Sequence, residues 1–364
     1  MRRLAGVDLF RGFAAYAVVL IHAPGVHGNF DQPKLLVEIV NFSQFAVPFF
    51  LATSFYLTIS RIYATGTPYP LQSKVTRLLI PYGFWSVVYI IYTGLKYLIK
   101  GESDNLNSFF KDPISLIFFG GAALPLYFLP LLFSGMLLIK LTEFLIKKRT
   151  NLKVLVSLCV LSLSAYELIL WSGNSFHIVR HLAFQTLLNS IFPEGNDNPL
   201  LRIVLCVVAL FIRCSPYILI AMLLNNQSLK GSLINLMKPS ISYTIVLFGI
   251  FFILNLFGGS LLPQSVYEVT RGYSALLFAI SISNYIKENN VVTNLGISSF
   301  GIYLIHYLIL VILLPIENRI YPNAVIKFPV STVLIITTLS FIMSWLVTYL
   351  LMRKRSMTKL MFGI

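Results

Sequence analysis

The sequence is poor in charged residues. Asp, Glu, Lys and Arg make up 11% of its 364 residues, whereas an average soluble domain carries about 25%. Hydrophobic residues make up 57%, and the mean hydropathy is +0.81. No polar stretch is long enough for a soluble catalytic domain, so we expect one transmembrane domain over 1–364 and no fused soluble domain.

Cysteine is scarce too, and several catalytic motifs are missing. Cys159, Cys206 and Cys214 all fall in apolar segments, and no CxxC pair is present, so neither a disulfide framework nor a thiolate metal site is indicated. A thiol buried in lipid keeps its proton and is a poor nucleophile. GxSxG, Walker A, GxGxxG and HExxH are also absent, so serine-hydrolase, ATPase and protease chemistry have no support.

What the sequence does have is a series of apolar runs of helix length. Runs of about 20 residues predict an all-α, polytopic membrane protein with about ten transmembrane helices. The span 201–224 contains Arg213 and Pro216, so it is predicted as one span, a broken helix or two short pieces. The ten predicted spans are 9–27, 42–62, 78–98, 123–143, 154–171, 201–224, 240–257, 271–286, 295–315 and 329–351.

Loop charge predicts the orientation of these spans. If the N-terminus is cytoplasmic, the cytoplasmic segments carry the larger share of Lys and Arg, notably at 147–149 and 353–355. Under the positive-inside rule both termini are therefore predicted to be cytoplasmic, in a multi-pass plasma (inner) membrane protein. Arg271 is assigned to the outer side. The net charge of +15 follows mostly from topology and does not indicate nucleic-acid binding.

The first predicted helix carries three ionisable residues. Arg11 and His22 are eleven residues apart, which places them on nearly the same helix face, about 16 Å apart along the axis. Asp8 precedes Arg11 by three residues and can pair with it. One interpretation is an interfacial salt bridge plus a packing histidine. The other is functional: Asp8 orients Arg11 for a phosphate or carbonyl contact, and neutral His22 acts as a general base. Polar groups at this depth usually mark function.

Two further clusters follow the same helical spacing. Lys74 and Arg77 share a face at the cytoplasmic mouth of the third span. They are either positive-inside anchors or a clamp for the phosphates of a nucleotide-bearing donor. Tyr303 and His306 are polar residues within an apolar segment, for which hydrogen bonding between helices is the favoured interpretation.

The remaining candidates give weaker signals. His177 and His181 have the i, i+4 spacing of half a zinc site, but no third ligand stands at helical spacing. An interfacial amphipathic segment is the favoured interpretation, and no metal is expected. Glu167 is a lone acid near the outer end of the fifth span, which either faces an acceptor or snorkels.

Four motifs together resemble one known family, membrane acyltransferase family 3. They occur in the family's order and cover nearly the whole chain. The first departs from the frequent Asp-Gly-Leu-Arg form by reading Asp-Leu-Phe-Arg, and the second has Lys where Arg is common. The motifs are Asp8-Leu9-Phe10-Arg11-Gly12 with His22, Lys74-x-x-Arg77 with Pro81-Tyr82, Tyr127-Phe128-Leu129-Pro130, and Ser299 through His306.

The resemblance implies an O-acyltransferase. Such an enzyme moves an acyl group, usually acetyl, from cytoplasmic acyl-CoA to a hydroxyl of an extracytoplasmic polysaccharide, glycan or lipid-linked sugar. Carried onto this chain, the catalytic set is His22, Arg11 and Asp8, and the donor-binding set is Lys74, Arg77 and Arg11. His22 serves either as a general base or as a transient acyl carrier.

Two alternatives use the same residues. One is an exporter or flippase for polysaccharide or lipid-linked sugar, with Arg11 and His22 as a proton or substrate relay. The other is a non-catalytic scaffold or sensor. Competition by free CoA separates a donor clamp from a flippase, and a scaffold tolerates the loss of both side chains.

Overall fold

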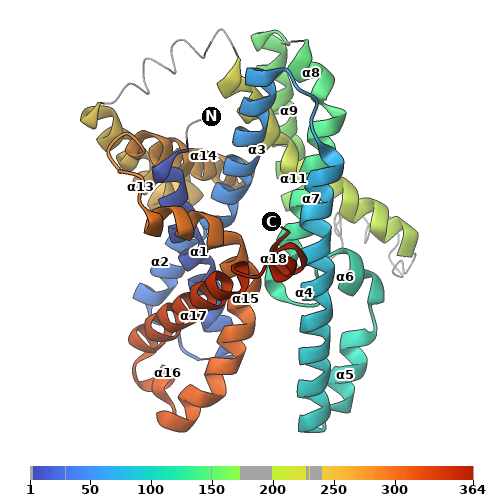
Figure 1. Cartoon of the computed structure of the whole chain (residues 1–364), viewed down its shortest axis with the longest axis vertical. Helices are drawn as coiled ribbons and strands as arrows, with labels where there is room; N and C mark the ends of the chain where they lie inside the picture. The colour runs from blue at the N-terminus through green and yellow to red at the C-terminus, as the bar shows by residue number, and fades with distance from the viewer. Residues whose placement is uncertain are drawn as a thin grey trace.

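The structure is a computed structural model that describes residues 3–28, 30–148, 150–172, 199–226, 229 and 240–363. All regular structure in these residues is helical (Figure 1), which confirms the predicted all-α class. Within the same residues, nine helices are long and apolar enough to cross a membrane. The protein is therefore a multi-pass membrane protein.

The N-terminal third contains three membrane-crossing units. The second consists of two helices, α2 and α3, which continue as one apolar span from Lys34 to Thr65 and are separated only by a turn at 44–45. The sequence prediction of 42–62 captured α3 and missed α2. The helices are α1 (Ala5–Val26), α2 (Lys34–Ser43), α3 (Ala46–Thr65) and α4 (Leu71–Lys100).

The rest of the described chain contains both long and short helices. The short ones are α5 (Ser103–Phe110), α6 (Pro113–Phe118), the 3-10 helix η1 (Leu124–Tyr127), α8 (Glu143–Lys147), α16 (Ala324–Lys327) and α18 (Arg355–Phe362). The long ones are α7 (Phe128–Leu141), α9 (Leu152–Trp171), α11 (Pro199–Asn225), α13 (Ile241–Leu261), α14 (Gln264–Ile282), α15 (Asn290–Ile320) and α17 (Pro329–Met352).

The predicted span 201–224 is a single helix, α11. Pro216 lies inside it and lacks the N–H that would bond the carbonyl of Ile212, four residues earlier. The hydroxyl of Ser215 donates to that carbonyl instead, at 2.8 Å. This replacement lets the helix continue through the proline without a break.

The predicted span 271–286 occurs as α14, which begins seven residues earlier than predicted. It has 19 residues, about 28 Å at helical rise, so it is long enough to cross a bilayer. Arg271 is 4% exposed inside α14, so it lies within a helix and not in a loop, and its place on the outer side stays a prediction. With α14 counted, ten helices among the described residues are long enough to cross a bilayer.

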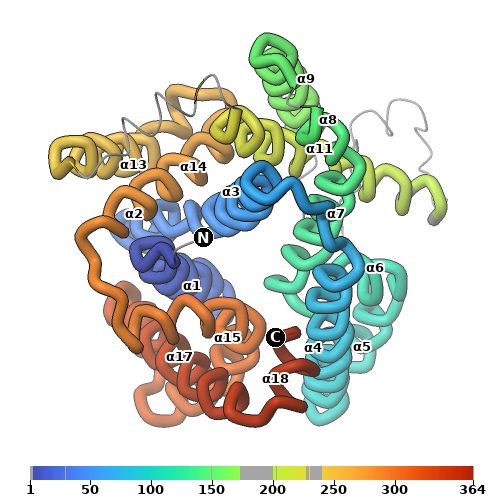
Figure 2. The backbone as a smooth tube through the Cα atoms, turned by 45° about the horizontal axis from the view of Figure 1, so that its top comes forward, coloured from blue at the N-terminus to red at the C-terminus, as the bar shows by residue number. Residues whose placement is uncertain are grey.

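Helix α1 lies within the bundle and packs against α15, α17, α3, α14 and α2. Figure 1 places α1, α15 and α17 on one side of the molecule and α4 with α5 and α6 on the other. In Figure 2 the helices form a ring, and α18 lies between α15 and α4. Trp85 of α4 holds α18 by donating to the carbonyl of Met361 at 2.9 Å.

Candidate functional site

The first part of the site is a basic cavity of about 600 Å³ where α3 ends and α4 begins. Arg61, Lys74 and Arg11 all line it, and none of its described lining residues is acidic. Tyr69 also lines it, and burial raises the pKa of this tyrosine to about 12. The hydroxyl therefore stays protonated and can donate to an anion. By the predicted topology this cavity faces the cytoplasm.

The structure brings only one member of the predicted Lys74/Arg77 pair into this cavity. Arg77 is exposed and does not line it. Gly363, after α18, packs on the Arg77 backbone so closely that a side chain there would strike the Arg77 carbonyl. Arg61 supplies the second cation of the cavity, which the sequence pattern had predicted to be Arg77. The sequence held no signal for this, since Arg61 is one of many basic residues at cytoplasmic helix ends.

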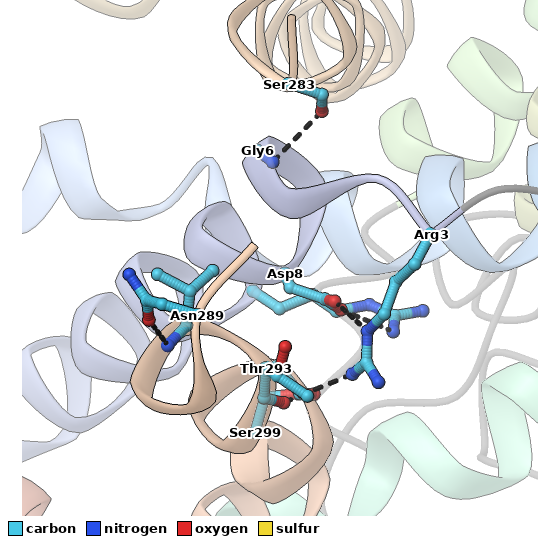
Figure 3. A network of polar contacts seen from close by, with 10 residues as sticks. Arg3, Gly6, Asp8, Ser283, Asn289, Thr293 and Ser299 are labelled. Carbon is cyan, nitrogen blue, oxygen red and sulfur yellow. Dashed lines mark hydrogen bonds and ion pairs between the residues drawn. The ribbon is translucent and has the colours of Figure 1, made fainter. Parts of the chain in front are cut away.

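Asp8 lies between two arginines. Arg3 Nε donates to Asp8 Oδ2 at 2.5 Å, whereas Arg11 Nη1 lies 3.7 Å from Oδ1. Figure 3 shows Arg3 extending across to Asp8 and to the Thr293 carbonyl at the start of α15. A glycine, Gly296, makes room for Asp8, because a Cβ at this position would lie 2.6 Å from the Asp8 carboxyl carbon. The predicted Asp8–Arg11 pair therefore exists, but Arg3 is the nearer partner.

Arg11 connects the basic cavity with a second one. This middle cavity has a volume of about 330 Å³ and shares Arg11, Ser54 and Leu132 with the first. Its far end is formed by Tyr303 of α15, whose hydroxyl donates to the carbonyl of Pro125 in η1. This bond between segments confirms the prediction for Tyr303.

His22 lies in a third cavity of about 220 Å³, which shares Tyr303 with the middle cavity and is called the outer cavity because the predicted topology places it farthest from the cytoplasm. Tyr127 of η1 lines the same cavity. Among the described residues, the His22 ring has no hydrogen-bond partner. Pro24 is inside α1, which ends at Val26, so His22 is in the last turns of the helix. The imidazole is therefore next to a space that a substrate can occupy.

A second histidine stands beside His22. The rings of His22 and His306 have centroids 5.4 Å apart. His306 is fully buried, and its Nδ1 bonds the carbonyls of Tyr303 and Ile302 in its own helix, at 2.7 and 3.2 Å. The prediction of bonding between helices is therefore wrong for this residue. Because Nδ1–H donates, Nε2 is an acceptor, and it has no partner among the described residues.

The outer cavity also contains charged residues that the sequence did not identify as functional. Glu268 of α14 accepts from Tyr166 at 2.6 Å and from Arg213 Nη2 at 3.3 Å. Arg213, Glu268 and Arg271 all line the cavity with His22. For Arg213 and Arg271, the sequence feature that could have identified them was a charged residue within a predicted apolar span. For Arg213 this signal was interpreted as a helix interruption.

The weaker candidates find structural roles or fall outside the described part. Glu167 accepts the backbone N–H of Ser265 at 2.7 Å, at the N-terminus of α14, where a carboxylate stabilises a helix. His177 and His181 lie outside the described residues. Within the part of the chain that is described, no group of three His, Cys, Asp or Glu side chains has a metal-site arrangement.

Comparison with known proteins gives one match. The family model described as "Acyltransferase domain" matches residues 4–352, nearly the whole chain. Searches of curated proteins and of solved structures return no match. The matched range includes the described cavities and all four motifs. The chain therefore belongs to membrane acyltransferase family 3 and is an acyltransferase.

Proposed function

We propose that this acyltransferase moves an acyl group, most often acetyl, from cytoplasmic acyl-CoA to a hydroxyl of an extracytoplasmic sugar. The acceptor is a surface polysaccharide, a glycan or a lipid-linked sugar, and the enzyme lies in the plasma membrane. One observation carries the proposal. Three cavities share lining residues and lead from Arg61 and Lys74, through Arg11 and Tyr303, to His22.

The donor end of this path suits a polyanion. CoA carries phosphates, and the basic cavity presents Arg61, Lys74 and Arg11 with no acid among its described lining residues. Arginine and lysine bind phosphate oxygens through charge-assisted hydrogen bonds. The cavity volume falls from about 600 to 330 to 220 Å³ along the path. The nucleotide therefore stays at the wide end, and the narrow pantetheine arm extends toward His22.

The outer end suits proton transfer. The acceptor hydroxyl attacks the thioester carbonyl while His22 removes its proton. The C–S bond then breaks, and the proton passes from His22 to the departing CoA thiolate, so an ester and free CoA are formed. Arg11 lies along the path as a cation for the donor. In the covalent variant the acyl group first bonds to His22 and CoA leaves before the acceptor enters.

The proposal is tested by replacing His22. We expect His22→Ala to lower the rate of acyl transfer from radiolabelled acetyl-CoA by about 10²–10⁴-fold, because general-base catalysis contributes that much. Surface glycans of cells that carry only the variant should lose one acyl unit by mass spectrometry. Wild-type transfer by purified His22→Ala would refute both versions of the mechanism.

Donor binding is tested by substitutions in the basic cavity. The same experiment distinguishes an acyltransferase from a flippase. Lys74→Gln with Arg61→Gln should weaken acetyl-CoA binding, and free CoA should compete with it. Lys100→Gln is the matched control, because Lys100 is exposed at the opposite end of the same helix. Transport of a lipid-linked sugar that is insensitive to CoA would favour the flippase.

A further inference from the structure

Arg271 is a buried cation without a carboxylate partner in the described part of the chain. It is 4% exposed and lines the outer cavity together with His22. Its Nη1 donates to the Tyr267 hydroxyl at 2.8 Å, and its guanidinium lies 4.5 Å from the centre of the Tyr267 ring. Its Nε finds no hydrogen-bond partner among the described residues. A charge held this way inside a membrane protein is costly and usually serves function.

The charges around the outer cavity do not cancel. Glu268 is the only acid among its described lining residues, and it is paired with Arg213 at 3.3 Å. Arg271 is therefore an extra positive charge in the cavity that His22 also lines. The guanidinium has five donors in a planar fork that matches carboxylate and phosphate oxygens. A ligand with such a group would supply the missing counter-ion.

We infer that the outer cavity is an oxyanion subsite and that the acceptor carries a carboxylate or a phosphate on or next to the sugar that is acylated. The oxyanion pairs with Arg271 while the reacting hydroxyl lies at His22. This inference rests on the proposed function, because it specifies the acceptor of that reaction. A cavity of about 220 Å³ is smaller than the ~300–1,000 Å³ of most ligand sites, so it accommodates one charged sugar unit.

A binding experiment tests this without relying on catalysis. Purified full-length protein in detergent is titrated with methyl glucuronide, glucose 6-phosphate, methyl glucoside or inorganic phosphate at constant ionic strength, and its thermal unfolding is followed. We expect one or both charged sugars to reach half-saturation at about tenfold to hundredfold lower concentration than the neutral glucoside, as for hydrogen bonds to charged groups. The two charged sugars separate carboxylate from phosphate, and inorganic phosphate reports binding of the anion alone.

Variants attribute the effect to this subsite. Arg271→Gln should abolish the preference for the charged sugar, and Arg271→Lys should retain part of it. Arg319→Gln, an exposed arginine near the end of α15, should behave like wild type. His22→Ala should abolish acyl transfer but keep the preference for charged over neutral sugar, because Arg271 is unchanged, so failure of acyl transfer and loss of the charge preference are observed separately.

Three outcomes would overturn the inference. These are equal binding of neutral and charged sugars by the wild type, no binding of either charged sugar, and an unchanged preference in Arg271→Gln. If the glutamine variant does not fold, the wild-type comparison of glucuronide with glucoside still decides, because a cavity without charge preference contradicts the inference.

Discussion

Asp8 contacts two arginines, and we expect the two to have separable roles. Arg3 lies 2.5 Å from Asp8 and Arg11 lies 3.7 Å from it. Because Coulomb energy falls with the inverse of distance, the Arg3 pair is about 1.5-fold stronger at equal dielectric. Arg11 lines two cavities, whereas Arg3 lines none of the three. Arg3 thus neutralises Asp8 and leaves Arg11 available to the donor.

The expected magnitudes follow from exposure. The Arg3 and Arg11 side chains are 40% and 32% exposed, so water screens both pairs. We expect Arg3→Gln to cost about 1–2 kcal/mol of stability, and Arg11→Gln about 0.5–1 kcal/mol. By contrast, Arg11→Gln should lower kcat/KM for acetyl-CoA by about 10²–10³-fold, as for other lost electrostatic contacts in active sites. Arg3→Gln should leave kcat/KM near the wild-type value.

Thermal unfolding of the purified variants and acyl transfer in membranes that supply the native acceptor measure the two effects. Arg355→Gln serves as the control, since Arg355 is an exposed arginine on α18. Combining each arginine variant with Asp8→Asn completes two double-mutant cycles. The coupling free energy with Asp8 should be larger for Arg3 than for Arg11. If Arg3→Gln impairs transfer as much as Arg11→Gln does, the separation of roles is wrong.

Two further predictions concern the path and the cytoplasmic loop. Leu132→Trp should fill the junction between the basic and middle cavities and lower the rate of acyl transfer by about 10²-fold. The control is Leu141→Trp, at an exposed position of α7, which should leave the rate unchanged. Normal transfer by Leu132→Trp would exclude this path for the donor. Burial raises the pKa of Glu143, but hydrogen bonds from Lys140 and Lys147 outweigh it, so this pKa lies below its ordinary value of 4.5. The ionised Glu143 carboxylate therefore stabilises the fold fully above pH 4.5. This stabilisation is lost as the pH falls through the lower pKa of the folded state. Glu143→Gln should therefore lower the free energy of unfolding at pH 7 by about 1 kcal/mol, and this difference, measured by thermal unfolding, should shrink at pH 3. A difference that stays constant with pH would contradict the assignment.

The part of the site that lies on α1 could be predicted from the sequence, because it depends on local periodicity. Helical spacing predicts that Arg11 and His22 share a face, and both line the connected cavities. The i, i+3 rule also predicted the Asp8–Arg11 pair. It could not reveal the nearer partner, Arg3, because Arg3 precedes the first helix and approaches Asp8 through the path of the chain.

The residues that reach His22 from elsewhere could not be predicted. Tyr127, Glu268 and Arg271 are far from His22 in the sequence, and only the packing of η1 and α14 against the bundle brings them to one cavity. A single sequence carries no information on such contacts. The number of helices could be predicted from the lengths of the apolar runs, but the first residue of α14 could not. Charged residues in its first turns conceal a helix whose polar side chains face the protein interior.

The charge distribution along the path gives the proposed reaction its direction. Among the described residues that line the basic cavity, every charged group is a cation. The outer cavity instead has Arg213 paired with Glu268, and Arg271 as a further cation. In the proposed reaction, the nucleotide of the donor carries several phosphates, so it gains most in the basic cavity and is too large for the outer cavity, which only the pantetheine arm approaches. An acceptor with a single oxyanion is small enough for the outer end, where one cation is uncompensated. Under the proposed mechanism the two substrates meet near Tyr303 and His22 without competing for the same charges, as transfer across a membrane in one step requires.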